Sequence, residues 1–212
     1  MNKQELLHIG IAIVILTAVI SLKDFLAEDF SLLGMALIAS VLIIGINIGV
    51  KKLTAYVYDC DVQHRIWMWS RYGLKQSSHL KRDIPAGIIV PLLGAIISLG
   101  ALKITSILTY DSTAQAKRLP KKEGFYSFTE VTEWENGIIG SAGIIAVLTL
   151  SFVTYWIPGL ELISQTAAFY AFFNMFPVSK LDGTQIFFGS RVVWTALALI
   201  STIFAVYAVI LL

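Results

Sequence analysis

The residues best suited to carry chemistry lie in the run 171–191, which reads AFFNMFPVSKLDGTQIFFGSR. An apolar stretch is broken there by Asn174, Pro177, Asp182 and Gly183, between flanks too apolar for an aqueous loop. An ionisable residue in such a setting indicates a functional site, because a charge at membrane depth is costly unless it is paired or used. The alternative is a surface turn between two helices, in which Asp182 caps the second helix.

The composition indicates what kind of protein must position these residues. Of the 212 residues, 57% are hydrophobic and only 14% are charged, against about a quarter in an ordinary soluble domain. We therefore expect an integral membrane protein that contacts the lipid bilayer. The net charge of +2 is too small to indicate a nucleic-acid partner. The single cysteine, Cys60, excludes an internal disulfide and a cysteine-based zinc cluster.

Runs of apolar residues predict an all-α membrane protein of one domain, 1–212, with about six transmembrane helices. The predicted spans are approximately 6–22, 32–50, 84–108, 137–156, 160–176 and 192–212. The fifth stretch has an alternative interpretation, as a broken helix that dips into the membrane and continues after Gly183. The segment 110–136 is polar, and its alternating pattern predicts a small β-hairpin or sheet edge on the bilayer surface.

Charge asymmetry predicts the orientation. The stretch 51–83 carries seven basic and three acidic residues, so the positive-inside rule places it, and with it the N-terminus, in the cytoplasm. Lys3 precedes the first apolar run, but no small-residue cleavage site follows, so we interpret this run as a retained anchor. The pattern favours a prokaryotic plasma membrane.

Five positions carry a resemblance to a known family. Asn174, Pro177 and the sequence Leu181-Asp182-Gly183 resemble the second signature of the site-2 protease family of intramembrane zinc metalloproteases. The resemblance implies a site-2 protease-like core, in which this Asp would be the third zinc ligand and the five residues would line a substrate groove.

The same family has a His-Glu-x-x-His motif on an earlier helix, and this chain contains no such motif. The stretch 47–60 resembles the region where the motif would lie. On this register the two His positions fall at Asn47 and Lys51, and the general-base Glu falls at Ile48. The sequence 140–143, Gly-Ser-Ala-Gly, also resembles the small-residue helix of the family.

These replacements remove the chemistry of hydrolysis. A catalytic zinc needs three protein ligands and an open position, and Asp182 supplies only one ligand. An ammonium at Lys51 repels a divalent cation, and Ile48 cannot take a proton from water. We therefore expect no catalytic residue, metal or cofactor, and a pseudoprotease that binds transmembrane segments of other proteins or regulates a partner.

Lys51 has two interpretations. On the proposed register it faces Asp182, so that a Lys–Asp pair could replace the metal and join two helices. Alternatively, Lys51 and Lys52 end the second helix and snorkel to the cytoplasmic headgroups, and the sequence alone favours this second interpretation. The three histidines do not restore a metal site: we expect His8 near an interface, and His64 and His79 in contact with solvent or headgroups.

Two other functions stay open. One is an active intramembrane zinc metalloprotease with unconventional ligands, or a form of one whose ligands were replaced by mutation. The other is a small transporter or channel subunit that uses Asp182 and Lys103 to line a polar path. The sequence does not identify a partner or an oligomeric state.

Overall fold

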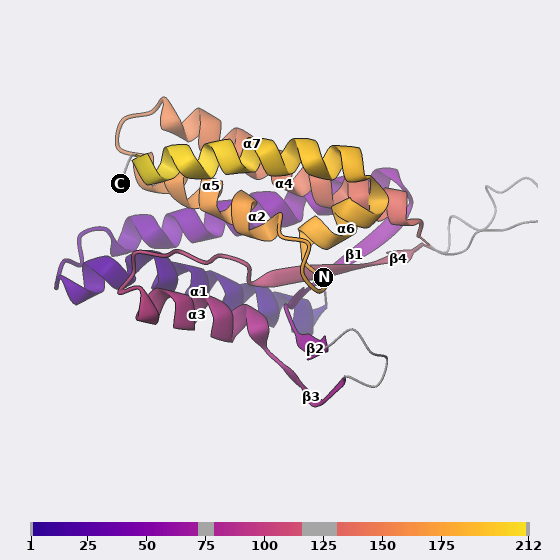
Figure 1. The fold of residues 1–212 in the computed structure, drawn as a ribbon, viewed down its shortest axis with the longest axis horizontal. Coiled ribbons are helices and arrows are strands. Elements are labelled where there is room, and N and C mark those ends of the chain that lie inside the picture. The colour runs from indigo at the N-terminus through magenta and orange to yellow at the C-terminus, as the bar shows by residue number, and fades with distance from the viewer. Residues whose placement is uncertain (1, 72–78, 116–130, 211–212) are drawn as a thin grey trace, which may run out of the picture.

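The computed structural model describes residues 2–71, 79–115 and 131–210. Helices are the main component of this part of the chain (Figure 1). In chain order the elements are α1 (Lys3–Leu26), α2 (Leu33–Val57), β1 (Cys60–Ile66), β2 (Trp69–Arg71), β3 (His79–Ile84), α3 (Ala86–Ile97), β4 (Leu108–Ala114), α4 (Glu133–Tyr155), α5 (Glu161–Asn174), α6 (Asp182–Gly189) and α7 (Arg191–Ile210).

Four helices of the described residues are long and apolar enough to cross a membrane: α1, α2, α4 and α7. They correspond to four of the six predicted spans. In Figure 1 they run along the long axis of the molecule, with α1 and α3 on one side and α4 and α7 on the other. Buried apolar side chains fill the space between them, including Leu16, Ala36, Ile43, Ile144 and Val147.

The other two predicted spans are short helices. The range 84–108 contains only the 12-residue α3, which ends near Leu99 and Gly100, both at positive φ, and β4 begins at Leu108. The range 160–176 contains the 14-residue α5. At 1.5 Å per residue these helices are about 18 and 21 Å long, short of the roughly 30 Å apolar core of a bilayer. Among the described residues, four helices and not six are long enough to span a membrane, and α5, followed by a break and then α6, fits the broken-helix alternative.

The all-α prediction also needs correction, because the described residues form two small antiparallel sheets. One pairs β1 with β4, with His64 opposite Tyr110. The other pairs β2 with β3. The first residues of the predicted 110–136 hairpin or sheet edge form a strand, β4, whose partner among the described residues is β1. Residues 116–130 lie outside the described part of the chain.

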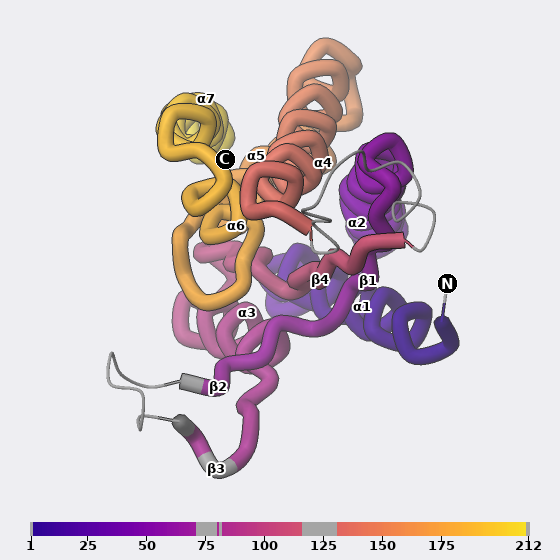
Figure 2. Tube along the Cα trace, turned by 90° about the vertical axis from the view of Figure 1, so that its right-hand side faces the viewer, coloured from indigo at the N-terminus to yellow at the C-terminus, as the bar shows by residue number. Residues whose placement is uncertain are grey.

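The β1–β4 sheet crosses one end of the helical bundle, where α1 begins and α2 ends (Figure 2). Along β1 buried and exposed residues alternate, so that Cys60, Val62, His64 and Ile66 face inward. Alternation follows from the two-residue period of a strand. The sheet therefore places an ionisable side chain, His64, against the end of the bundle that also holds α6.

Candidate functional site

A buried ion pair joins α2 to α6. Lys51 Nζ lies 2.6 Å from Asp182 Oδ2, and the two side chains are 3% and 1% exposed. Lys51 is in the last two turns of α2, and Asp182 is the first residue of α6. This contact corrects the snorkelling interpretation of Lys51. The surface-turn alternative holds in part: residues 176–180 form an exposed turn between α5 and α6, but Asp182 is buried and pairs with Lys51 instead of capping α6.

Glycines of α4 make room for the pair. A Cβ on Gly143 would lie 2.6 Å from Lys51 Cε and 3.0 Å from Asn47 Nδ2. Asn47 and Lys51 are four residues apart and therefore share one face of α2. Closer to the start of α4, a Cβ on Gly137 would lie 3.0 Å from the Cα of Gly189 in α6. The small-residue face of α4 thus lets both α2 and α6 approach it closely.

Tyr110 of β4 covers the ammonium of Lys51. Lys51 Nζ lies 4.6 Å from the centroid of the Tyr110 ring, within the range of a cation–π contact. Two hydrogen bonds hold Tyr110 in place. Its hydroxyl donates to the carbonyl of Asn136 at 2.6 Å, and its backbone carbonyl accepts from Gln185 Nε2 at 2.8 Å. Tyr110 is fully buried. It therefore separates the pair from the polar hollow of about 320 Å³ that Tyr110, Asn136 and Gln185 help to line.

Several buried polar atoms near the pair have no hydrogen-bond partner among the described residues. They are Asn47 Nδ2, Asn174 Oδ1 and Asp182 Oδ1. Asn174 is fully buried and uses its Nδ2 to donate to the Tyr170 carbonyl at 2.8 Å. Such a cluster of polar atoms is costly to bury in an apolar interior.

Only some of the residues that carry the resemblance to the site-2 protease family lie close together in the structure. Asn47, Ile48 and Lys51 are buried on α2, and Asp182 reaches Lys51. Leu181 and Gly183 are buried in the same turn, where a Cβ on Gly183 would overlap the Met175 carbonyl.

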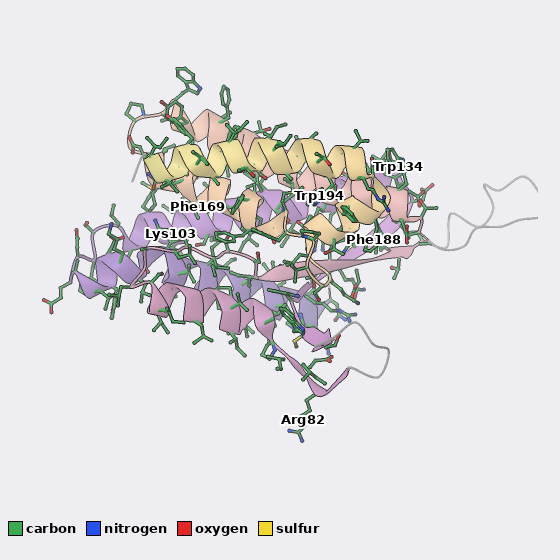
Figure 3. All side chains as sticks on the ribbon, in the orientation of Figure 1. Arg82, Lys103, Trp134, Phe169, Phe188 and Trp194 are labelled. Carbon is green, nitrogen blue, oxygen red and sulfur yellow. The ribbon has the colours of Figure 1, made fainter. Side chains whose placement is uncertain are left out.

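Pro177 lies apart from the ion pair, at an apolar surface hollow. The hollow has a volume of about 230 Å³, lies between the end of α5 and α7, and is lined also by Phe172, Met175 and Phe176. Trp194 of α7 closes one side and donates from Nε1 to the Met175 carbonyl at 3.0 Å. Figure 3 shows Trp194 on this side of the molecule. Met175 thus connects the hollow to the turn that carries Asp182.

A second buried cluster lies next to the pair and was missed by the sequence analysis. Glu5 of α1 is 5% exposed, and its Oε1 lies 2.6 Å from Lys52 Nζ and 3.4 Å from His64 Nδ1. The backbone N–H of His64 also donates to Glu5 Oε1 at 3.3 Å. His64 is 1% exposed, so its predicted contact with solvent is wrong.

The charge state of His64 follows from its surroundings. Burial, together with the positive charge of Lys51, lowers the pKa of His64 to about 3, although Glu5 acts in the opposite direction. The ring is therefore neutral at neutral pH. Its Nδ1 faces the Glu5 carboxylate and so carries the proton, and Nε2 has no hydrogen-bond partner among the described residues. The alternation in 60–66 was the signal that could have predicted an inward-facing His64.

The remaining candidates lie elsewhere. His8 is half-buried on α1, and the side chain of His79 is outside the description. Lys103 is 6% exposed in the segment after α3, where burial lowers its pKa and Asp24 opposes this effect. Figure 3 shows Lys103 toward the opposite end of the bundle from Phe188 of α6. The structure therefore does not bring Lys103 and Asp182 to one polar path.

The donor set at Asp182 does not fit the zinc site of the family that the sequence resembles. A tetrahedral catalytic zinc needs three protein ligands. The carboxylate of Asp182 pairs with the ammonium of Lys51, and within ranges 2–71, 79–115 and 131–210 no group of three His, Cys, Asp or Glu side chains is close enough to hold a metal ion. The ammonium of Lys51 occupies the side of the carboxylate where a cation would bind.

Comparison with known proteins adds no relative. The chain matches no protein-family model, no curated protein and no solved structure.

Proposed function

We propose that this chain is a non-catalytic membrane protein with a site-2 protease-like core, in which the Lys51–Asp182 pair stands in place of a catalytic metal. The observation that carries the proposal is the 2.6 Å contact between these two side chains. The resemblance assigns Lys51 and Asp182, which are 131 residues apart in the sequence, to zinc-ligand positions. Their meeting in a buried contact, with Asn47 on the same face of α2, supports that register.

The pair has a structural consequence for the proposed role. A charge-assisted hydrogen bond between two buried partners fixes the end of α2 against the start of α6 without metal. Because an unpaired charge at this depth would be costly, the two helices stay together. The site is therefore a fixed joint that cannot activate water.

We propose transmembrane segments of other proteins as the partners of this core. The apolar hollow at Pro177 and Phe176 supports this, since it opens beside the turn that leads to Asp182. α7 borders the hollow, and only 22% of its most apolar stretch is buried in the protein. An apolar helix of a partner can pack against such a surface by van der Waals contact. We place the α1 and β1 end in the cytoplasm of a prokaryotic cell.

A gain of metal binding tests the register. The triple variant Asn47→His, Ile48→Glu, Lys51→His restores two imidazoles and a general base opposite Asp182. We expect it to bind about one zinc per chain, because three ligands suffice for a catalytic-type site. Adding Asp182→Ala should abolish that binding. A folded triple variant that binds no more zinc than the wild type would contradict the register.

Photo-crosslinking tests the partner class. A photoreactive residue in place of Phe176, which borders the hollow, should crosslink to membrane-spanning proteins in native membranes. The matched position is Val14, which is 67% exposed on α1 and lies outside the hollow. Equal crosslinking from both positions would show ordinary lipid-phase collisions and contradict the proposed groove.

A further inference from the structure

The start of α1 is attached to the rest of the molecule through one buried carboxylate. Glu5 Oε1 contacts Lys52 Nζ at 2.6 Å, the His64 ring at 3.4 Å and the His64 backbone N–H at 3.3 Å. Glu5 therefore links α1 to both the end of α2 and β1. A polar hollow of about 470 Å³ borders this attachment, and Glu5, Lys52, Cys60 and Gln63 are among its lining residues.

Within this attachment, the surroundings of His64 oppose the protonation of its ring. Its Nδ1 already donates toward Glu5, and its Nε2 is buried without a partner among the described residues. A proton on Nε2 would place a second positive charge next to Lys51 in the interior. Burial and the Lys51 charge both disfavour that state, which is why the pKa of His64 falls to about 3 from its ordinary 6.5.

The charged and titratable groups around His64 come from each neighbouring element. α1 contributes Glu5, α2 contributes Lys51 and Lys52, and β4 contributes Tyr110, whose ring centroid lies 6.3 Å from that of His64. α6 contributes Asp182, which acts through Lys51. α3 carries no titratable side chain.

We propose that the first turns of α1 form a proton-sensitive latch over β1, which opens when His64 takes up a proton. In the closed state burial and the charge of Lys51 keep His64 neutral, while the contacts with Glu5 hold it against the start of α1. In the open state His64 is hydrated and binds a proton readily, so acidification favours opening. Opening uncovers the end of α2 next to Lys51. The latch would therefore regulate access to the Lys51–Asp182 joint; that last step rests on the proposed function, whereas the latch itself does not.

The direction and size of the pH effect on latch opening follow from proton linkage. A histidine with a lowered pKa in the closed state stabilises that state fully above its ordinary pKa, and this stability is lost as the pH falls from 6.5 toward about 3. With these two values the open population should rise about tenfold between about pH 7.5 and pH 5.5. This window stays above the ordinary pKa of Asp and Glu, about 4.

The single cysteine of the chain provides the probe. Cys60 is 1% exposed, lies on the same inward face of β1 as His64 and lines the polar hollow. Its rate of modification by an aromatic disulfide reagent, which reacts with thiols even in acid, should report opening. Dividing the rate in the unfolded chain by the rate in the folded chain at the same pH removes the pH dependence of the thiol itself.

For the purified wild-type chain we expect this protection of Cys60 to fall about tenfold over the stated pH window. His64→Gln should abolish the fall, and the same substitution at His8, half-buried on α1, should leave it unchanged. Constant protection in the wild type would overturn the latch, and this result does not depend on whether His64→Gln folds. An undiminished fall in a folded His64→Gln would also overturn it. Because no partner is present, failure of the proposed function would not affect either outcome.

Discussion

Removal of one or both members of the Lys51–Asp182 pair should give strongly non-additive losses of stability. Two unit charges 2.6 Å apart attract by about 6 kcal/mol at an effective dielectric constant of about 20. Much of this attraction is offset by the desolvation of both charges. Lys51→Met or Asp182→Leu alone leaves the other charge buried and unpaired, which should cost about 3–5 kcal/mol.

The double variant Lys51→Met, Asp182→Leu removes the attraction and both desolvation penalties together. It should therefore lie within about 2 kcal/mol of the wild type, since apolar replacement of a buried ion pair is often close to neutral. The coupling free energy in the double-mutant cycle should then be at least about 3 kcal/mol.

Reversible unfolding in mixed micelles, followed by tryptophan fluorescence, measures each free energy. The matched control is Lys180→Met, because Lys180 is 70% exposed and lies 3.4 Å from Asp111. That exposed contact should contribute less than about 1 kcal/mol. Losses at Lys51 and Asp182 that simply add would refute the reasoning, because they would mean that the two charges do not interact in the folded protein.

Two glycine substitutions test the packing around the pair by the same unfolding assay. Gly143→Ala should destabilise the protein by about 1–3 kcal/mol, because its Cβ would press on Lys51. The control is Gly45→Ala on α2, whose Cβ would meet no neighbouring element within 4 Å and which should be neutral or stabilising by up to about 1 kcal/mol. Equal effects of the two substitutions would contradict the packing described at Gly143. Gly183→Ala should lower the free energy of unfolding more than Gly143→Ala does, because its Cβ would meet the rigid backbone carbonyl of Met175. A Gly183→Ala protein as stable as the wild type would show that the turn before α6 differs from the one described.

Hydropathy predicted the long helices and failed for the short ones for a physical reason. α3 is as apolar as a membrane span but has only 12 residues, whereas α5 is less apolar and is buried against other helices from Ile163 to Ala171. Apolar composition reports removal from water, and it does not distinguish lipid from protein as the new surroundings. Helix-breaking residues were the better guide, since Gly100 lies inside the first stretch and Pro177 ends the second.

The candidate site was predictable in its residues but only partly in its contacts. The register that placed Lys51 opposite Asp182 came from the resemblance, whereas a lysine near a helix end can equally well reach the headgroups. Packing of α4 against α2, at Gly143, decided between the two, and such long-range packing leaves little trace in one sequence. His64 was wrongly placed in contact with solvent because the alternation of β1 lies within a stretch interpreted by its charge, and Glu5 on α1 was not singled out.

The most direct test of the central claim is the metal content and proteolytic activity of the purified wild-type chain. Zinc should be measured after purification in zinc-containing buffer, together with cleavage of a model transmembrane substrate. We predict far less than one zinc per chain and no cleavage, because the ammonium of Lys51 occupies the carboxylate of Asp182. About one zinc per chain, with cleavage that Asp182→Ala abolishes, would contradict the account.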